Sequence, residues 1–153
     1  MNPTPEKTSV MAPFILMLFL YFIVGLFTVI NQQFQVPLKS ALLPHDGNMT
    51  NALVTLLNFS WFLAYPFSEG FATRWVDRLG YRKTSVYSLL IFIAGLGFYE
   101  AAVLLHIYAP SYITIMGNPI FTGFFVFLSG SFVIGMAVTI LQVVTGLYLD
   151  VNP

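Results

Sequence analysis

The sequence has no cysteine and very few charged residues. Its 153 residues include six acidic and six basic side chains, so charged residues make up 8% of the chain, whereas soluble domains carry about 25%. Without cysteine, neither a disulfide framework nor a thiolate metal site can form. Because the charges cancel, no net field attracts nucleic acid, and we expect no nucleic-acid partner. Hydrophobic residues make up 58% of the chain, which indicates a membrane protein.

Four apolar segments are long enough to cross a bilayer, which takes about 20 residues per helix. They cover residues 13–36, 52–72, 84–105 and 121–149. The sequence therefore predicts an all-α membrane protein with four transmembrane helices. The last segment is long for one crossing, which favours a tilted helix or a cytoplasmic extension. A loop without Lys or Arg is predicted at 107–119.

The basic residues are distributed unevenly among the predicted loops. Four of the six lie in the segment 73–83, between the second and third predicted spans. Lys7 falls on the same side of the membrane and Lys39 on the other. Short loops rich in Lys and Arg stay in the cytoplasm. We therefore predict a basic cytoplasmic loop at 73–83 and a cytoplasmic amino terminus.

That loop contains the string Asp77-Arg78-Leu79-Gly80-Tyr81-Arg82-Lys83. A tight turn at Gly80 would let the carboxylate of Asp77 form a charge-assisted network with Arg78, Arg82 and Lys83 and brace two helix ends. The alternative is that the cluster only orients the chain. The string resembles the loop signature of the major facilitator superfamily, in which a glycine, three residues and Asp-Arg-x-Gly-Arg-Arg/Lys are thought to gate the inner side. Thr73 and Tyr81 depart from that pattern.

A narrower resemblance covers the first and fourth spans. The run 21–25, Tyr-Phe-Ile-Val-Gly, followed by Asn31 and Pro37, is similar to the first helix of the fucose and glucose/galactose permease branch. The run 141–149 is similar to that branch's Leu-(Glu or Gln)-x-x-x-Asn-Pro-Tyr-Leu, with Gly and Leu replacing Asn and Pro. The resemblance implies monosaccharide transport by alternating access between two six-helix halves. This chain would then be the first part of the amino-terminal half.

The resemblance also implies site residues. Proton-coupled fucose permeases carry carboxylates at the positions that correspond to Gln32 and Gln142. Glutamine can form hydrogen bonds with sugar hydroxyls but cannot carry a coupling proton. Glu100 is the leading replacement, because an ionisable residue inside a span is by default a functional candidate. The alternative is that Glu100, about one turn from the outer end of its span, only reaches the interface.

Further polar and amphipathic residues are placed to line a sugar path. Asn31, Asn58 and Trp61, with Ser60, offer amide hydrogen bonds and an aromatic ring for the apolar face of a sugar. The alternative is that they bond between helices. Small residues let helices approach closely, and we predict this role for the glycines at positions 25, 95, 97, 130, 135 and 146.

Two classes of function follow. The first is transport of a small solute across a plasma (inner) membrane by a full-length permease, with a sugar, lipid and the remaining helices as partners. The chain ends directly after its fourth predicted span, so we expect a fragment that does not transport alone. The second is a complete four-span scaffold or subunit. No paired carboxylate or His cluster suits acid/base or metal chemistry, so we expect no enzyme, no metal site and no cofactor.

Overall fold

The computed structural model describes residues 11–33, 37, 40, 43, 47–115 and 117–151. Lys7, Lys39 and the last part of the first predicted span lie outside the described residues. The described chain is mostly helical. It contains the helices α1 (Met11–Gln33), α3 (Asn48–Tyr108) and α4 (Thr122–Val151) and a short pair of strands between the last two.

All three helices are long and apolar enough to cross a membrane. At 1.5 Å per residue, the 23 residues of α1 and the 30 residues of α4 extend about 35 and 45 Å. The hydrocarbon core of a bilayer is about 30 Å thick. The excess length of α4 agrees with the expectation from its sequence.

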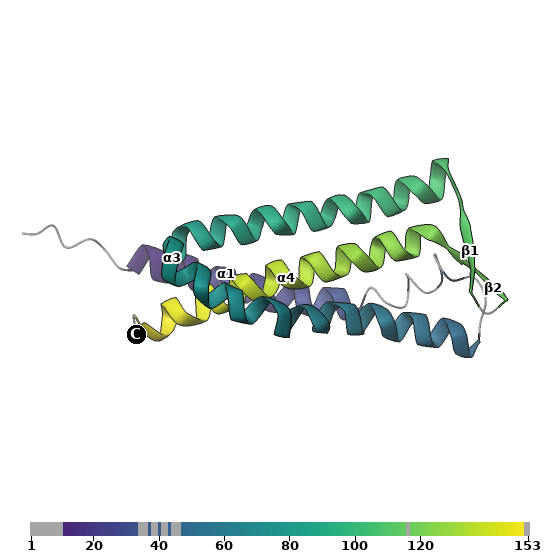
Figure 1. Cartoon of the computed structure of the whole chain (residues 1–153). Coiled ribbons are helices and arrows are strands. Elements are labelled where there is room, and N and C mark those ends of the chain that lie inside the picture. The colour runs from purple at the N-terminus through teal and green to yellow at the C-terminus, as the bar shows by residue number, and fades with distance from the viewer. Residues whose placement is uncertain are drawn as a thin grey trace, which may run out of the picture.

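Helix α3 has 61 residues and is interrupted at Gly80, whose φ of 77° and ψ of 166° are not helical. This backbone region is open almost only to glycine. The chain turns back at this point, so that the two arms of α3, 48–79 and 81–108, run in opposite directions (Figure 1). The loop predicted at 73–83 is therefore wrong in extent. Its residues other than Gly80 include good helix formers and remain helical.

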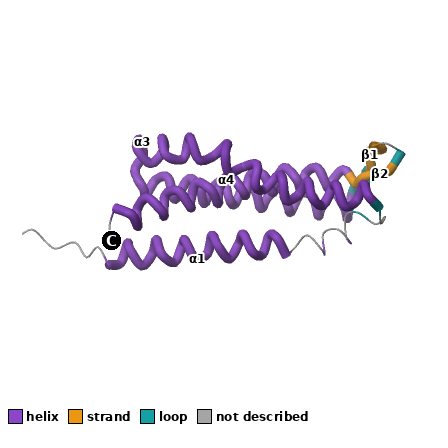
Figure 2. The backbone as a smooth tube through the Cα atoms, turned by 90° about the horizontal axis from the view of Figure 1, so that it is seen from below, coloured by secondary structure: helices purple, strands orange, loops and turns teal. Residues whose placement is uncertain are grey.

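Helix α4 lies centrally and contacts both α3 and α1, whereas α1 lies along one side of the bundle (Figure 2). The sequence of α4 suits this place, because it combines small residues with large apolar ones and carries no charge before Asp150. Only Met17 and Val24 of α1 are buried. Helix α1 is thus the least enclosed of the three helices.

Three glycines form close contacts between α3 and α4. A Cβ added at Gly95, Gly130 or Gly135 would press on atoms of the facing helix. At the other three positions predicted for this role, 25, 97 and 146, no atom lies within 4 Å of an added Cβ. The prediction was wrong there, because those positions do not face a packed neighbour within the described structure.

A β-hairpin lies at the end of the bundle opposite to Gly80 (Figure 1). Strands β1 (Tyr112–Ile115) and β2 (Asn118–Phe121) pair in antiparallel fashion, with Tyr112 opposite Phe121. The all-α prediction missed this hairpin. Its first strand, Tyr-Ile-Thr-Ile, is rich in residues that favour strands, and Phe121 anchors the second strand in the buried core.

Candidate functional site

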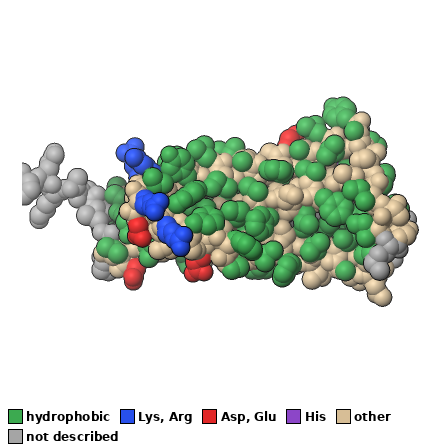
Figure 3. All heavy atoms as spheres, viewed as in Figure 1, with side chains coloured by type: hydrophobic (Ala, Val, Ile, Leu, Met, Phe, Trp, Pro, Cys, Tyr) green, Lys and Arg blue, Asp and Glu red, His purple; other side chains and the backbone are tan. Residues whose placement is uncertain are grey.

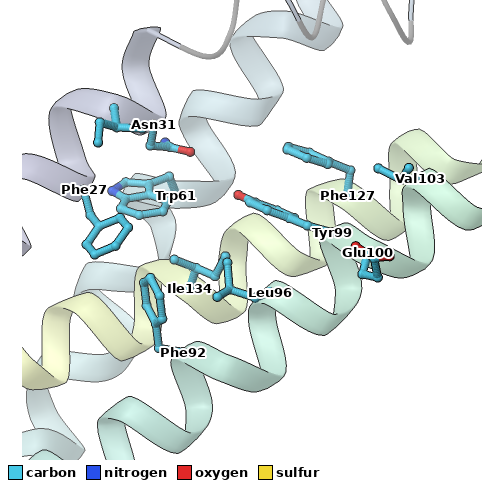
Figure 4. Close-up of a pocket in the computed structure, with 11 residues that line it drawn as sticks. Phe27, Asn31, Trp61, Phe92, Leu96, Tyr99, Glu100, Val103, Phe127 and Ile134 are labelled. Atoms are coloured by element: carbon cyan, nitrogen blue, oxygen red, sulfur yellow. The ribbon is translucent and has the colours of Figure 1, made fainter.

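A cavity of about 540 Å³ lies between α1, both arms of α3 and α4. Its wall is mostly apolar. Figure 4 shows its lining, in which the apolar side chains are Phe27, Ile30, Phe92, Leu96, Val103, Phe127 and Ile134. Four lining residues carry polar atoms, and they are Asn31, Trp61, Tyr99 and Glu100. Ligand sites of proteins commonly combine an apolar wall with a few polar groups in this way.

Three of the residues proposed from the sequence line this cavity, Trp61 as a buried side chain, Asn31 as a half-buried one and Glu100 as an exposed one. Asn31 comes from the last turn of α1, Trp61 from the first arm of α3 and Glu100 from the second arm. Trp61 and Glu100 lie at nearly equal distances along the chain from Gly80. Antiparallel arms therefore bring them to the same level of the bundle. The bend at Gly80 is thus what assembles the site.

Gln32, Gln142 and Asn58 do not line this cavity. Gln32 is exposed, because successive residues of a helix point about 100° apart and its neighbour Asn31 faces the cavity. Gln142 and Asn58 are half-buried. The structure also separates the two glutamines. Gln32 lies eight residues beyond Val24, which packs in one cluster with Leu141, so the two glutamines differ in level by roughly 12 Å.

Tyr99 is a lining residue that the sequence did not single out. Its hydroxyl shares a hydrogen bond of 2.9 Å with Ser131 Oγ on α4. Its ring stacks on Phe127, with 4.0 Å between ring centroids. Both contacts hold Tyr99 against α4. Its position directly before Glu100, within an apolar span, is the signal that could have identified it.

Ser60 illustrates the alternative role of a polar residue in a helical bundle. Its hydroxyl is buried and donates a 3.0 Å hydrogen bond to the carbonyl oxygen of Leu128 on α4. It is absent from the cavity lining. For Ser60 the structure therefore supports helix packing and not a solute contact.

Trp61 is the most enclosed polar group of the cavity, since only 2% of its surface is exposed. It packs in a cluster with Val24, Ile134 and Val138. Its indole Nε1 is buried and has no hydrogen-bond partner within the described structure. An unpaired buried donor costs about 1–3 kcal/mol, so this nitrogen calls for an explanation.

The residues proposed for gating lie at one end of the bundle, around Gly80. Asp77, Arg78, Arg82 and Lys83 are all exposed, and charged side chains gather at this end (Figure 3). Across the described chain, no ion pair joins Asp77 to these cations. The predicted charge network is therefore not formed, as expected where water solvates exposed charges and pairing gains little. Near this end, the aromatic ring of Tyr81 packs against the ring of Tyr148 on α4, with 5.4 Å between the two ring centroids.

The described chain is mostly helical. Its three long apolar helices are consistent with an integral membrane protein. In the described parts of the chain, no group of three or more His, Cys, Asp or Glu side chains is placed to hold a metal ion. Comparison of the chain with models of protein families, with curated proteins and with solved structures gives no match.

Proposed function

We propose that this chain is part of a membrane transporter of the major facilitator type and that its cavity binds a small solute, a monosaccharide. The observation that supports this most directly is that Asn31, Trp61 and Glu100 line the same cavity. The three residues come from three different apolar segments, and each carries a group that can contact a sugar. Scattered interhelical bonds would not require them to share a space.

The chemistry of the cavity suits a ring with one apolar face and several hydroxyls. Its volume of about 540 Å³ lies within the range of about 300–1,000 Å³ that small-molecule sites occupy. The half-buried ring of Tyr99 offers an apolar surface, whereas Trp61 is almost fully buried and offers little. The amide of Asn31 can donate and accept hydrogen bonds, and the carboxylate of Glu100 can accept them.

In this proposal each arm of α3 crosses the membrane, so that the chain has four spans. Both arms, 48–79 and 81–108, are longer than the about 20 residues that a crossing requires. The Gly80 end, where Arg and Lys gather, lies in the cytoplasm. Alternating access would require the further helices of a complete permease, so the 153-residue chain alone would bind solute without transporting it.

Glu100 is the proposed coupling group of this site. Among the described lining residues it is the one carboxylate, whereas Gln32 and Gln142 cannot carry a proton. Transport by the complete permease should therefore be impaired by Glu100→Gln, and unchanged transport would remove Glu100 from this role.

Calorimetry on the purified chain in lipid nanodiscs tests the proposal, with L-fucose, D-galactose and D-glucose as probes. We expect one of these sugars to bind, and Asn31→Ala to weaken its binding roughly threefold to tenfold, which corresponds to the loss of one hydrogen bond. Gln32→Ala is the matched control, because this neighbouring side chain is exposed and lies outside the cavity. If the folded chain binds none of the three sugars, the proposal is wrong.

A further inference from the structure

The indole N–H of Trp61 is a buried hydrogen-bond donor on a residue that lines the cavity. The ring is 2% exposed, it lines the cavity, and its Nε1 has no partner among the described residues. Indole nitrogen only donates hydrogen bonds. The group that satisfies it must therefore present an acceptor atom. Figure 4 shows the Trp61 nitrogen on the side of Phe27 and Asn31.

The neighbours of Trp61 hold its ring in place. Its ring is held in the cluster of Val24, Ile134 and Val138, and its backbone carbonyl lies where Gly135 of α4 approaches. The neighbouring Tyr99 hydroxyl is already bonded to Ser131 at 2.9 Å. Trp61 is thus a packed donor whose hydrogen bond is unused in the described structure, whereas Tyr99 contributes its ring to the cavity lining.

We propose that Trp61 Nε1–H donates a hydrogen bond to an oxygen of the bound solute and so determines which solutes the cavity accepts. This inference rests on the proposed function, because it assigns a role within the same site. The solute must carry a hydroxyl or ring oxygen at the edge of its apolar face. A solute that presents only hydrogen or a methyl group there leaves the indole donor buried and unpaired.

Nuclear magnetic resonance can observe this bond directly, because the chain has two tryptophans and hence two indole N–H signals. We would label the indole nitrogens with ¹⁵N and add L-fucose, D-galactose or D-glucose to the chain in nanodiscs. A sugar that binds should move the Trp61 indole proton downfield and slow its exchange with D₂O. Trp75 is the internal control, because it contacts Phe71 and Tyr87 and does not line the cavity.

The variant Trp61→Phe keeps an aromatic ring and removes the donor. It assigns the signal, and we expect it to weaken binding of the same sugar roughly threefold to tenfold. A deoxy analogue that lacks the contacting hydroxyl should bind the native chain more weakly by a similar factor. It should bind Trp61→Phe no more weakly than the parent sugar does.

The outcomes separate this inference from the proposed function. If a sugar binds the native chain and the Trp61 indole signal stays in place, the donor role is wrong while sugar binding stands. The same holds if Trp61→Phe folds and binds the sugar equally well. If no sugar binds the native chain, the proposed function fails and this inference fails with it. Should Trp61→Phe not fold, the indole signal of the native chain decides.

Discussion

Gly135 shows how single residues determine the position of the candidate site. A Cβ at this position would lie 2.7 Å from the carbonyl oxygen of Trp61 and 2.9 Å from the Cβ of Ala64. Neither atom can rotate away, since one belongs to the backbone and the other is fixed to it. The absence of a side chain at Gly135 therefore sets the distance between α4 and the arm of α3 that carries Trp61.

Gly135→Ala should lower the free energy of unfolding by about 1–3 kcal/mol, the usual cost of overpacking. Gly146→Ala is the control on the same helix, because no atom lies within 4 Å of its added Cβ and alanine favours a helix. Circular dichroism during unfolding in mixed detergent and SDS micelles measures both. Equal stability of the two variants would show that the contact at Gly135 is not tight.

At this scale the sequence singled out some residues of the cavity lining and not others. Asn31, Trp61 and Glu100 stand out because each is polar or amphipathic within an apolar segment. Tyr99 does not stand out, because its place depends on Ser131 and Phe127, which lie on another helix. Gln32 was chosen by resemblance, and the rotation of one helical position takes it out of the cavity lining.

Among the elements, α3 determines the architecture through its bend at Gly80. A turn at this glycine was predicted from the sequence, but the loop around it was not correctly bounded. Helical structure continues on both sides because no other residue between 73 and 83 forces a break. The hairpin at 112–121 was missed because strands of four residues carry too little pattern to be distinguished from a loop.

Gly80→Ala should disturb the bend, because alanine adopts a φ of 77° and ψ of 166° only with a strain of about 1–3 kcal/mol. Spin labels on cysteines at the exposed positions Leu56 and Leu104, one on each arm, report the distance between the arms. We expect a broader and longer distance distribution than in the parent chain. Gly70→Ala, at a helical glycine with no atom within 4 Å of its added Cβ, should leave the distribution unchanged.

On the scale of the whole molecule, charge and apolar surface are segregated. Hydrophobic side chains cover the middle of the bundle, while Lys and Arg gather at one end (Figure 3). Large apolar residues of α1 such as Ile15 and Phe22 are 57% and 64% exposed. Water would penalise such a surface strongly, whereas lipid tails would cover it. The uneven distribution of Lys and Arg along the sequence predicted this segregation, but not which helix would lie at the centre.

The same segregation predicts how the bundle is oriented in the membrane. Single cysteines at the exposed positions Leu79, beside the bend, and Tyr112, in the hairpin, mark opposite ends of the molecule (Figure 1). The chain has no cysteine of its own, so each variant would carry one reactive thiol.

In intact cells, a membrane-impermeant maleimide should label Tyr112→Cys and spare Leu79→Cys, because the basic end stays in the cytoplasm. Both variants should react once the cells are permeabilised. Labelling of Leu79→Cys from outside would reverse the orientation and remove the cytoplasmic gating role proposed for Asp77, Arg78, Gly80, Arg82 and Lys83.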